Sequence, residues 1–144
     1  MRKLLSVCIF FSFLSSAHAQ LSEVYSGHIK KAEEAYAAKD YKASANHYSK
    51  AFEANGWKGT ATDRYNAACS WSLAGNPDSS FFQLERLATK MNYTNLGHIT
   101  SDTDLESLHK DKRWNETIAI VKQNKDKAEE GSVSAEVGVL VERG

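Results

Sequence analysis

Apolar residues recur at helical spacing along most of the chain. Over 21–38 they form two adjoining stripes with intervals of three and four positions, which predicts one helix. Asp40 is a favoured N-cap residue and predicts the start of a second helix, over 41–54. Asn55 and Gly56 tolerate the left-handed backbone that closes many helices, so we expect this helix to end there.

The same periodicity continues in two further segments. A third helix is expected over about 60–74, with Gly75-Asn76 as its end. Pro77 opens a fourth helix, over about 77–91, because proline lacks only an N–H that the first turn leaves unpaired. No segment up to this point alternates every second residue, as a half-buried strand does. These patterns predict an all-α fold.

A polar connection separates these helices from two more. Thr103 and Glu106 have the spacing of a capping box and predict a short helix over 104–110. Asp111 is a suitable cap for a last helix over 112–127. The inner face of that helix carries Trp114, Ile118 and Val121.

The last segment, 128–144, is charged at first and then carries alternating valines. We expect a flexible tail here, because an isolated strand has nothing to pair with. A short strand over 133–141 is the alternative that the valines suggest.

The start of the chain has the three parts of a secretory signal peptide, over 1–19. Two basic residues are followed by an almost wholly apolar stretch, and Ala17 and Ala19 form a small-x-small cleavage pattern before Gln20. A membrane anchor would need about twenty apolar residues, so no membrane span is expected after cleavage. A lipid anchor at Cys8 is disfavoured, because Cys8 lies inside the apolar stretch rather than at its end.

Cleavage would leave Cys69 as the remaining cysteine, so the mature protein would have no internal disulfide. An exported protein without a disulfide is more typical of a bacterium than of an animal secretory pathway. We therefore expect a periplasmic or secreted bacterial protein.

Charge and motif spacing disfavour several functions. Lys+Arg is 18 and Asp+Glu is 18, whereas a general nucleic-acid binder needs a basic surplus. No two histidines have metal-site spacing, and the chain has no serine elbow and no phosphate loop. The acidic run at 102–106 lacks the glycine of a calcium loop and indicates helix capping by Asp102 or Thr103. Cys69 has no base suggested nearby. We expect no cofactor, no metal and no enzyme activity.

The two inter-helix turns, Ala-Lys-Asp-Tyr at 38–41 and Ala-Gly-Asn-Pro at 74–77, lie about one tetratricopeptide repeat apart. The chain resembles that helix–turn–helix family over 25–91. Residues matching the repeat pattern are Tyr41, Ser44, Tyr48 and Ala51 in the first unit, and Ala68, Trp71 and Gly75 in the second. The departures are Ala35 at an aromatic position, Gly56 where proline is usual, and the absence of the early tryptophan.

A second likeness extends to about residue 124. Tyr65-Asn66-Ala67-Ala68-Cys69, followed by Asp102-x-Asp104-Leu105-x-x-Leu108 and by Trp114, resembles the closing segment of bacterial tetratricopeptide proteins. A stacked repeat needs such a cap over its exposed apolar end. The organisation implied is a signal peptide at 1–19, two repeat-like hairpins at 20–91, capping helices at 92–127 and a tail at 128–144.

The resemblance also implies a function, because the first helix of each repeat lines a concave face that binds proteins or peptides. Residues placed on or near that face are Ile29, Glu33, Tyr36, Tyr65, Asn66, Cys69 and Ser72. In some family members the position of Asn66 holds a peptide's backbone or carboxylate, but the basic partners of such a clamp are not evident here. We expect a non-catalytic binding module. An accessory of a hydrolase, or a structural protein without a ligand, is the alternative; partner identity and oligomeric state stay open.

Overall fold

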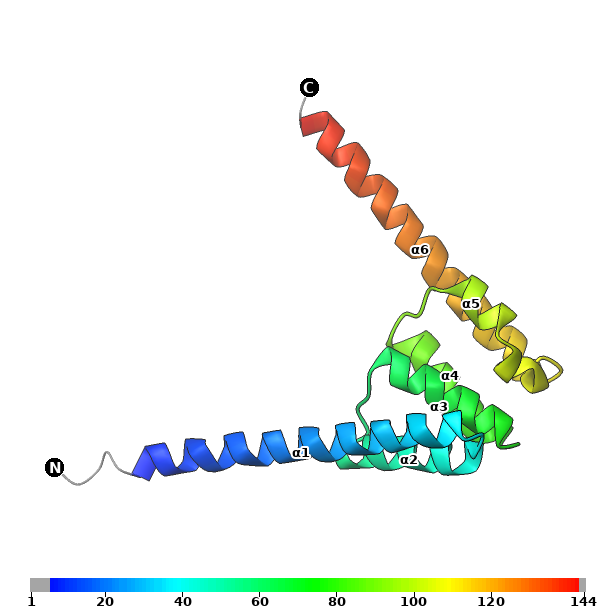
Figure 1. Cartoon of the computed structure of the whole chain (residues 1–144). Helices are drawn as coiled ribbons and strands as arrows, with labels where there is room; N and C mark the ends of the chain where they lie inside the picture. The colour runs from blue at the N-terminus through cyan, green and yellow to red at the C-terminus, as the bar shows by residue number, and fades with distance from the viewer. Residues whose placement is uncertain (1–5, 143–144) are drawn as a thin grey trace.

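The computed structural model describes the backbone of residues 6–142 and the side chains of 22–132 (Figure 1). Within these residues the chain is helical and contains no strand, which confirms the all-α prediction. The elements are α1 (Ser6–Ala37), α2 (Tyr41–Ala54), α3 (Ala61–Leu73), α4 (Pro77–Lys90), α5 (Leu96–Ser101), the 3₁₀-helix η1 (Thr103–Leu108) and α6 (Lys112–Glu142).

Polar caps define most helix starts. The Asp40 carboxylate accepts the backbone N–H of Ala43 at 3.0 Å and begins α2 as predicted. Asn76 caps α4, which has Pro77 in its first turn. Gly75 adopts φ +74°, the left-handed conformation that ends α3. Local chemistry therefore sets these boundaries.

The connection at 92–101 is less irregular than predicted, because Asn95 caps the short helix α5 and Ile99 is fully buried. The next element, η1, also differs from the prediction. The cap of η1 is Asp102, which accepts the N–H of Asp104 at 3.0 Å, and the turns are 3₁₀ over 103–108 rather than a helix over 104–110. The tighter turn suits a six-residue element that buries Leu105 and Leu108.

Consecutive helices pack side by side. α1 pairs with α2, α2 packs on α3, α3 pairs with α4, and α6 lies along α4 and α5, while η1 rests on α3 (Figure 1). The first turns of α1 and the last turns of α6 extend away from this body toward the two termini (Figure 1). Two helical hairpins and a covering C-terminal segment are thus present.

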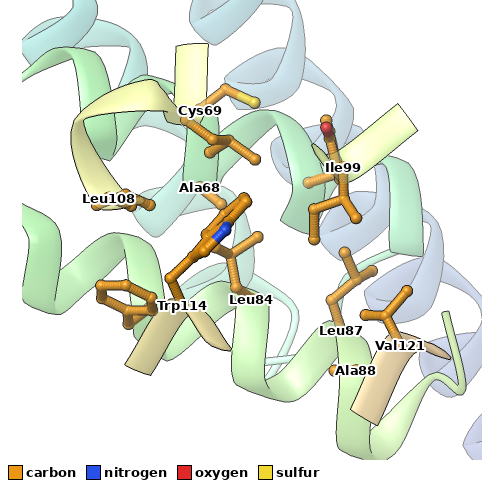
Figure 2. Packing of buried hydrophobic residues seen from close by; sticks show 12 residues of the cluster. Ala68, Cys69, Leu84, Leu87, Ala88, Ile99, Leu108, Trp114 and Val121 are labelled. Carbon is orange, nitrogen blue, oxygen red and sulfur yellow. The ribbon is translucent and has the colours of Figure 1, made fainter. Parts of the chain in front are cut away.

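Two apolar clusters hold the body together. The C-terminal core joins α3, α4, α5, η1 and α6, and Figure 2 shows Trp114 and Leu84 converging in its interior. Its buried members are Tyr65, Ala68, Cys69, Phe81, Leu84, Leu87, Ala88, Ile99, Leu105, Leu108, Trp114 and Val121. The N-terminal core consists of Ala32, Tyr48, Phe52 and Ala67, with Tyr25 and Ile29 packed against it. Burial of Trp114 and Val121 confirms the inner face predicted for the last helix.

α6 corrects the predicted C-terminus. We expected the helix to end near Lys127, with a strand as one alternative beyond it, but α6 continues as a helix to Glu142. Ion pairs one turn apart, Lys122–Asp126 at 2.6 Å and Lys125–Glu129 at 3.4 Å, favour this continuation. The flexibility predicted for 128–144 concerns motion and stays a prediction.

Within the predicted signal peptide, residues 1–5 lie outside the described residues, and the backbone from Ser6 onward belongs to α1. The side chains of the predicted cleavage site, Ala17, Ala19 and Gln20, also lie outside the described part. Among the described helices, none combines the length and the apolar character that crossing a membrane requires.

Candidate binding site

A cavity of about 250 Å³ opens where the two hairpins meet the C-terminal segment. α1, α2 and α3 form its walls, and the chain from α5 to η1 forms its remaining side. The lining residues are Glu33, Tyr36, Tyr48, Tyr65, Asn66, Cys69, His98, Asp102 and Asp104. We call this the acidic cavity.

The concave-face prediction and the cavity overlap in part. Glu33, Tyr36, Tyr65, Asn66 and Cys69 all line the acidic cavity. The other two predicted residues are not among its lining residues. Ile29 packs against the N-terminal core. The Ser72 hydroxyl lies 2.9 Å from that of Ser107, where η1 covers α3.

Tyrosine hydroxyls tie the hairpins to the C-terminal segment inside this cavity. Tyr36 on α1 donates a hydrogen bond to the Asp104 carboxylate. Tyr65 on α3 donates to Oδ2 of Asp102 at 2.8 Å. Both aspartates form part of the cavity wall, and Asp102 is also the cap of η1.

Three tyrosines in the cavity keep their protons at neutral pH. Burial is the largest cause of the raised pKa of Tyr65 and Tyr36, followed by their hydrogen bonds to the aspartates. Burial also raises the pKa of Tyr48 to about 12. These side chains consequently serve as neutral donors and aromatic surface rather than as acids.

Cys69 has the features of a structural cysteine. Its thiol is buried, and Sγ lies 3.8 Å from Oδ2 of Asp102, to which it is a weak donor. Burial first, then the negative charges of Asp102 and Asp104, raises the pKa of the thiol. A thiol held in its protonated form is a poor nucleophile.

His98 was missed by the sequence analysis. Its ring stacks on Tyr65 with centroids 4.6 Å apart, and its Nδ1 lies 3.0 Å from the hydroxyl of Tyr93. Nε2 lies 3.9 Å from Asp102. His98 lies on α5, far along the chain from α3, so no local pattern could have placed it here.

Distance alone would allow a metal ion. The thiol of Cys69 and the carboxylates of Asp102 and Asp104 have one donor atom each within 4.8 Å of one another. Each of these groups already takes part in a hydrogen bond, and the thiol acts as a donor. A metal would require a thiolate, which the raised pKa of Cys69 opposes.

No model of a known protein family matches this chain, and comparisons with curated proteins and with solved structures found no match. The tetratricopeptide resemblance thus rests on the residues that carry it, and the chemistry of the site is argued from its own side chains.

Proposed function

We propose that the protein is a non-catalytic binding module of tetratricopeptide type, which receives a protein or peptide in the groove containing the acidic cavity. The arrangement of the helices supports this proposal. α1/α2 and α3/α4 are consecutive hairpins in contact through α2 and α3, and η1 and α6 cover the second hairpin.

The observation that carries the proposal is the position of the cavity. Its walls include Glu33 and Tyr36 from α1 and Tyr65, Asn66 and Cys69 from α3, the first helices of the two hairpins. The repeat family uses this face for its ligands. Because Asp102 and Asp104 share the cavity with Asn66, recognition of a partner's C-terminal carboxylate is disfavoured.

The chemistry of the cavity favours binding over catalysis. It offers aromatic rings, hydroxyl donors and carboxylate acceptors, a combination common in recognition sites. The one thiol that lines it is protonated. Catalysis by Cys69 would need a thiolate and a paired base.

We also propose that the protein acts in the bacterial envelope or outside the cell, on the strength of its N-terminal sequence. Mass measurement of the protein from its own cells tests this directly. The expected chain begins at Gln20; an intact chain that begins at Met1 would contradict export by cleavage.

Cross-linking tests the binding function. Tagged protein is cross-linked in its own envelope fraction, and captured proteins are identified by mass spectrometry. One or two reproducible partners are expected, lost in the Tyr36→Ala and Tyr65→Phe variants but retained in Phe82→Ala. Phe82 is a suitable control because it is an exposed aromatic residue on α4 outside the cavity.

Circular dichroism must show that the variants remain folded. If no partner is captured, the structural role gains support. If a hydrolase is captured independently of Tyr36 and Tyr65, an accessory role on another surface replaces this proposal.

A further inference from the structure

We propose that the acidic cavity binds the guanidinium group of an arginine side chain on the partner. This inference rests on the proposed binding function and names the chemistry that the same site recognises. Charge, hydrogen-bonding capacity, aromatic surface and size each support it.

The charge of the lining is one-sided. Glu33, Asp102 and Asp104 are acidic, and no lysine or arginine is among the residues that line the cavity. His98 is the one basic side chain in the lining, so the acidic residues outnumber it by three to one. The tyrosines and the thiol are neutral, as their raised pKa values require. A cation entering the cavity would gain attraction from several carboxylates in surroundings less polar than water. An anion would be repelled by the same groups.

The carboxylates keep acceptor capacity for such a cation. An ionised carboxylate offers roughly four acceptor sites. Oδ2 of Asp104 accepts the Tyr36 hydroxyl, whereas Asp102 already accepts the Asp104 N–H, the Tyr65 hydroxyl and the Cys69 thiol, so Asp104 has the greater capacity left. Asp102 and Asp104 each have an oxygen within 4.8 Å of Cys69 Sγ and of each other. Two neighbouring carboxylates can share the several N–H donors that one guanidinium group carries.

Aromatic walls favour the same ligand. Tyr36, Tyr48 and Tyr65 line the cavity beside the carboxylates. Aromatic rings attract cations, and guanidinium groups in particular stack on them. A lysine ammonium is a compact point charge without a planar face, so it would stack less well on the tyrosine rings while it contacts the carboxylates.

The size of the cavity suits one side chain. Its volume is about 250 Å³, below the about 300–1,000 Å³ of pockets that hold drug-sized ligands. Glu33 is exposed, so the cavity has an acidic residue at its solvent side. The peptide backbone of the partner would lie outside, across α1 and α3.

An organic cation fits the cavity better than a metal ion does. Arginine brings its own protons and leaves the Cys69 thiol and the tyrosine bonds intact. A second cavity has the opposite charge and serves as a comparison within the same molecule. Its lining includes Lys58, Arg64, Arg86 and Lys90 and contains no acidic residue. A basic peptide should therefore avoid it.

The test is an NMR titration of the full ¹⁵N-labelled chain with blocked Gly-Gly-X-Gly-Gly peptides, where X is arginine or its neutral isostere citrulline. The arginine peptide should shift amide signals near Tyr36, Tyr65 and Asp104. Citrulline should bind about tenfold more weakly, the scale expected for losing a charge-assisted contact.

Asp104→Asn should weaken binding of the arginine peptide by about tenfold, because asparagine can still accept the Tyr36 bond but carries no charge. Glu106→Gln is the matched control. Glu106 is an exposed acid on the same element and does not line the cavity, so the affinity should stay unchanged. Asp102→Asn provides a second variant if Asp104→Asn unfolds.

Several outcomes would overturn the inference. Equal binding of the citrulline peptide, or tighter binding of a lysine peptide, would each refute an arginine side chain as the ligand. So would binding of one Co²⁺ with a thiolate absorption band that Cys69→Ser abolishes. If no peptide binds but cross-linking still captures a partner through Tyr36, only this inference fails and the proposed binding function stands.

Discussion

The N-terminal and C-terminal cores differ in the number of elements that contribute to them and in the size of their side chains. The C-terminal core draws side chains from every element between α3 and α6, whereas the N-terminal core consists mainly of small residues around Tyr48 and Phe52. α3 belongs to both, because Ala67 faces one core and Ala68 the other. The first hairpin contacts α3 through this smaller core, and hydroxyls and carboxylates add polar links to the rest of the molecule, as in Ser44–Ser70 and Tyr36–Asp104.

This difference explains where the cavity lies. Apolar side chains occupy the interior of the C-terminal core. At the junction with the first hairpin, the Tyr36–Asp104 and Tyr65–Asp102 hydrogen bonds reach the C-terminal segment, and the cavity lies among these side chains. The site therefore lies between the apolar C-terminal core and the polar junction with the first hairpin. The following variants test this difference between the two regions.

The largest effect should come from Trp114→Ala in the C-terminal core. Trp114 is 7% exposed and packs with side chains from the other elements of that core (Figure 2). Removing a buried tryptophan costs about 3–5 kcal/mol of unfolding free energy, measured by urea denaturation. An unchanged midpoint would mean that α6 does not cover the second hairpin as described.

A smaller loss is expected at Gly59, beside the N-terminal core. A Cβ there would lie 2.4 Å from Cε1 of Phe52, whose ring is buried and has the Arg64 guanidinium 4.7 Å above it. Gly59→Ala should cost about 1–3 kcal/mol through this overlap. Gly97→Ala is the matched control, because a Cβ at Gly97 meets no atom within 4 Å. Equal stability of the two variants would contradict the packing around Phe52.

The polar link between the hairpins should contribute less. The hydroxyls of Ser44 and Ser70 are 2.9 Å apart and both buried. A double-mutant cycle with Ser44→Ala and Ser70→Ala should give a coupling of about 1 kcal/mol. Additive effects would show that this bond does not join the hairpins.

The smallest effect is a pH dependence at Tyr25. Its hydroxyl donates to Asp63 at 2.5 Å, and burial followed by this bond raises the pKa of Tyr25 from 10 to about 12. The folded state favours the protonated phenol. Its stabilisation is therefore complete below pH 10 and is lost as the pH rises to about 12.

Tyr25→Phe removes this titration. Urea unfolding of both chains on either side of that window should show a steeper loss of stability in the natural chain. Parallel loss in the two chains would mean that the Tyr25–Asp63 bond is absent in solution.

Sequence reasoning succeeded where structure is local. The 3.6-residue period located the helices, and Asp40, Asn76 and Gly75 mark their boundaries through contacts within a few positions. It failed at α5 and at the end of α6, where short polar runs carry little apolar periodicity. Asn95 caps α5, and the Lys125–Glu129 ion pair crosses the predicted end of the last helix.

The other part of the cavity could not be predicted from the sequence, for a different reason. The face of α1 and α3 follows from helical spacing, and Glu33, Tyr36, Tyr65, Asn66 and Cys69 do lie together. His98, Asp102 and Asp104 reach them only through tertiary packing. The sequence indicated helix capping by Asp102 or Thr103 and gave no role to His98 or Asp104. A capping residue gives no local sign that its side chain also lines a cavity.

One measurement tests most directly the claim that the partner binds at the acidic cavity. A photoreactive amino acid replaces Glu33 at the cavity in one variant and Glu116, exposed on α6 and not part of its lining, in another. Irradiation in the native envelope fraction should link a partner to the first variant and leave the second unlinked. Equal yields from both positions, or a partner linked through Glu116 alone, would contradict the account.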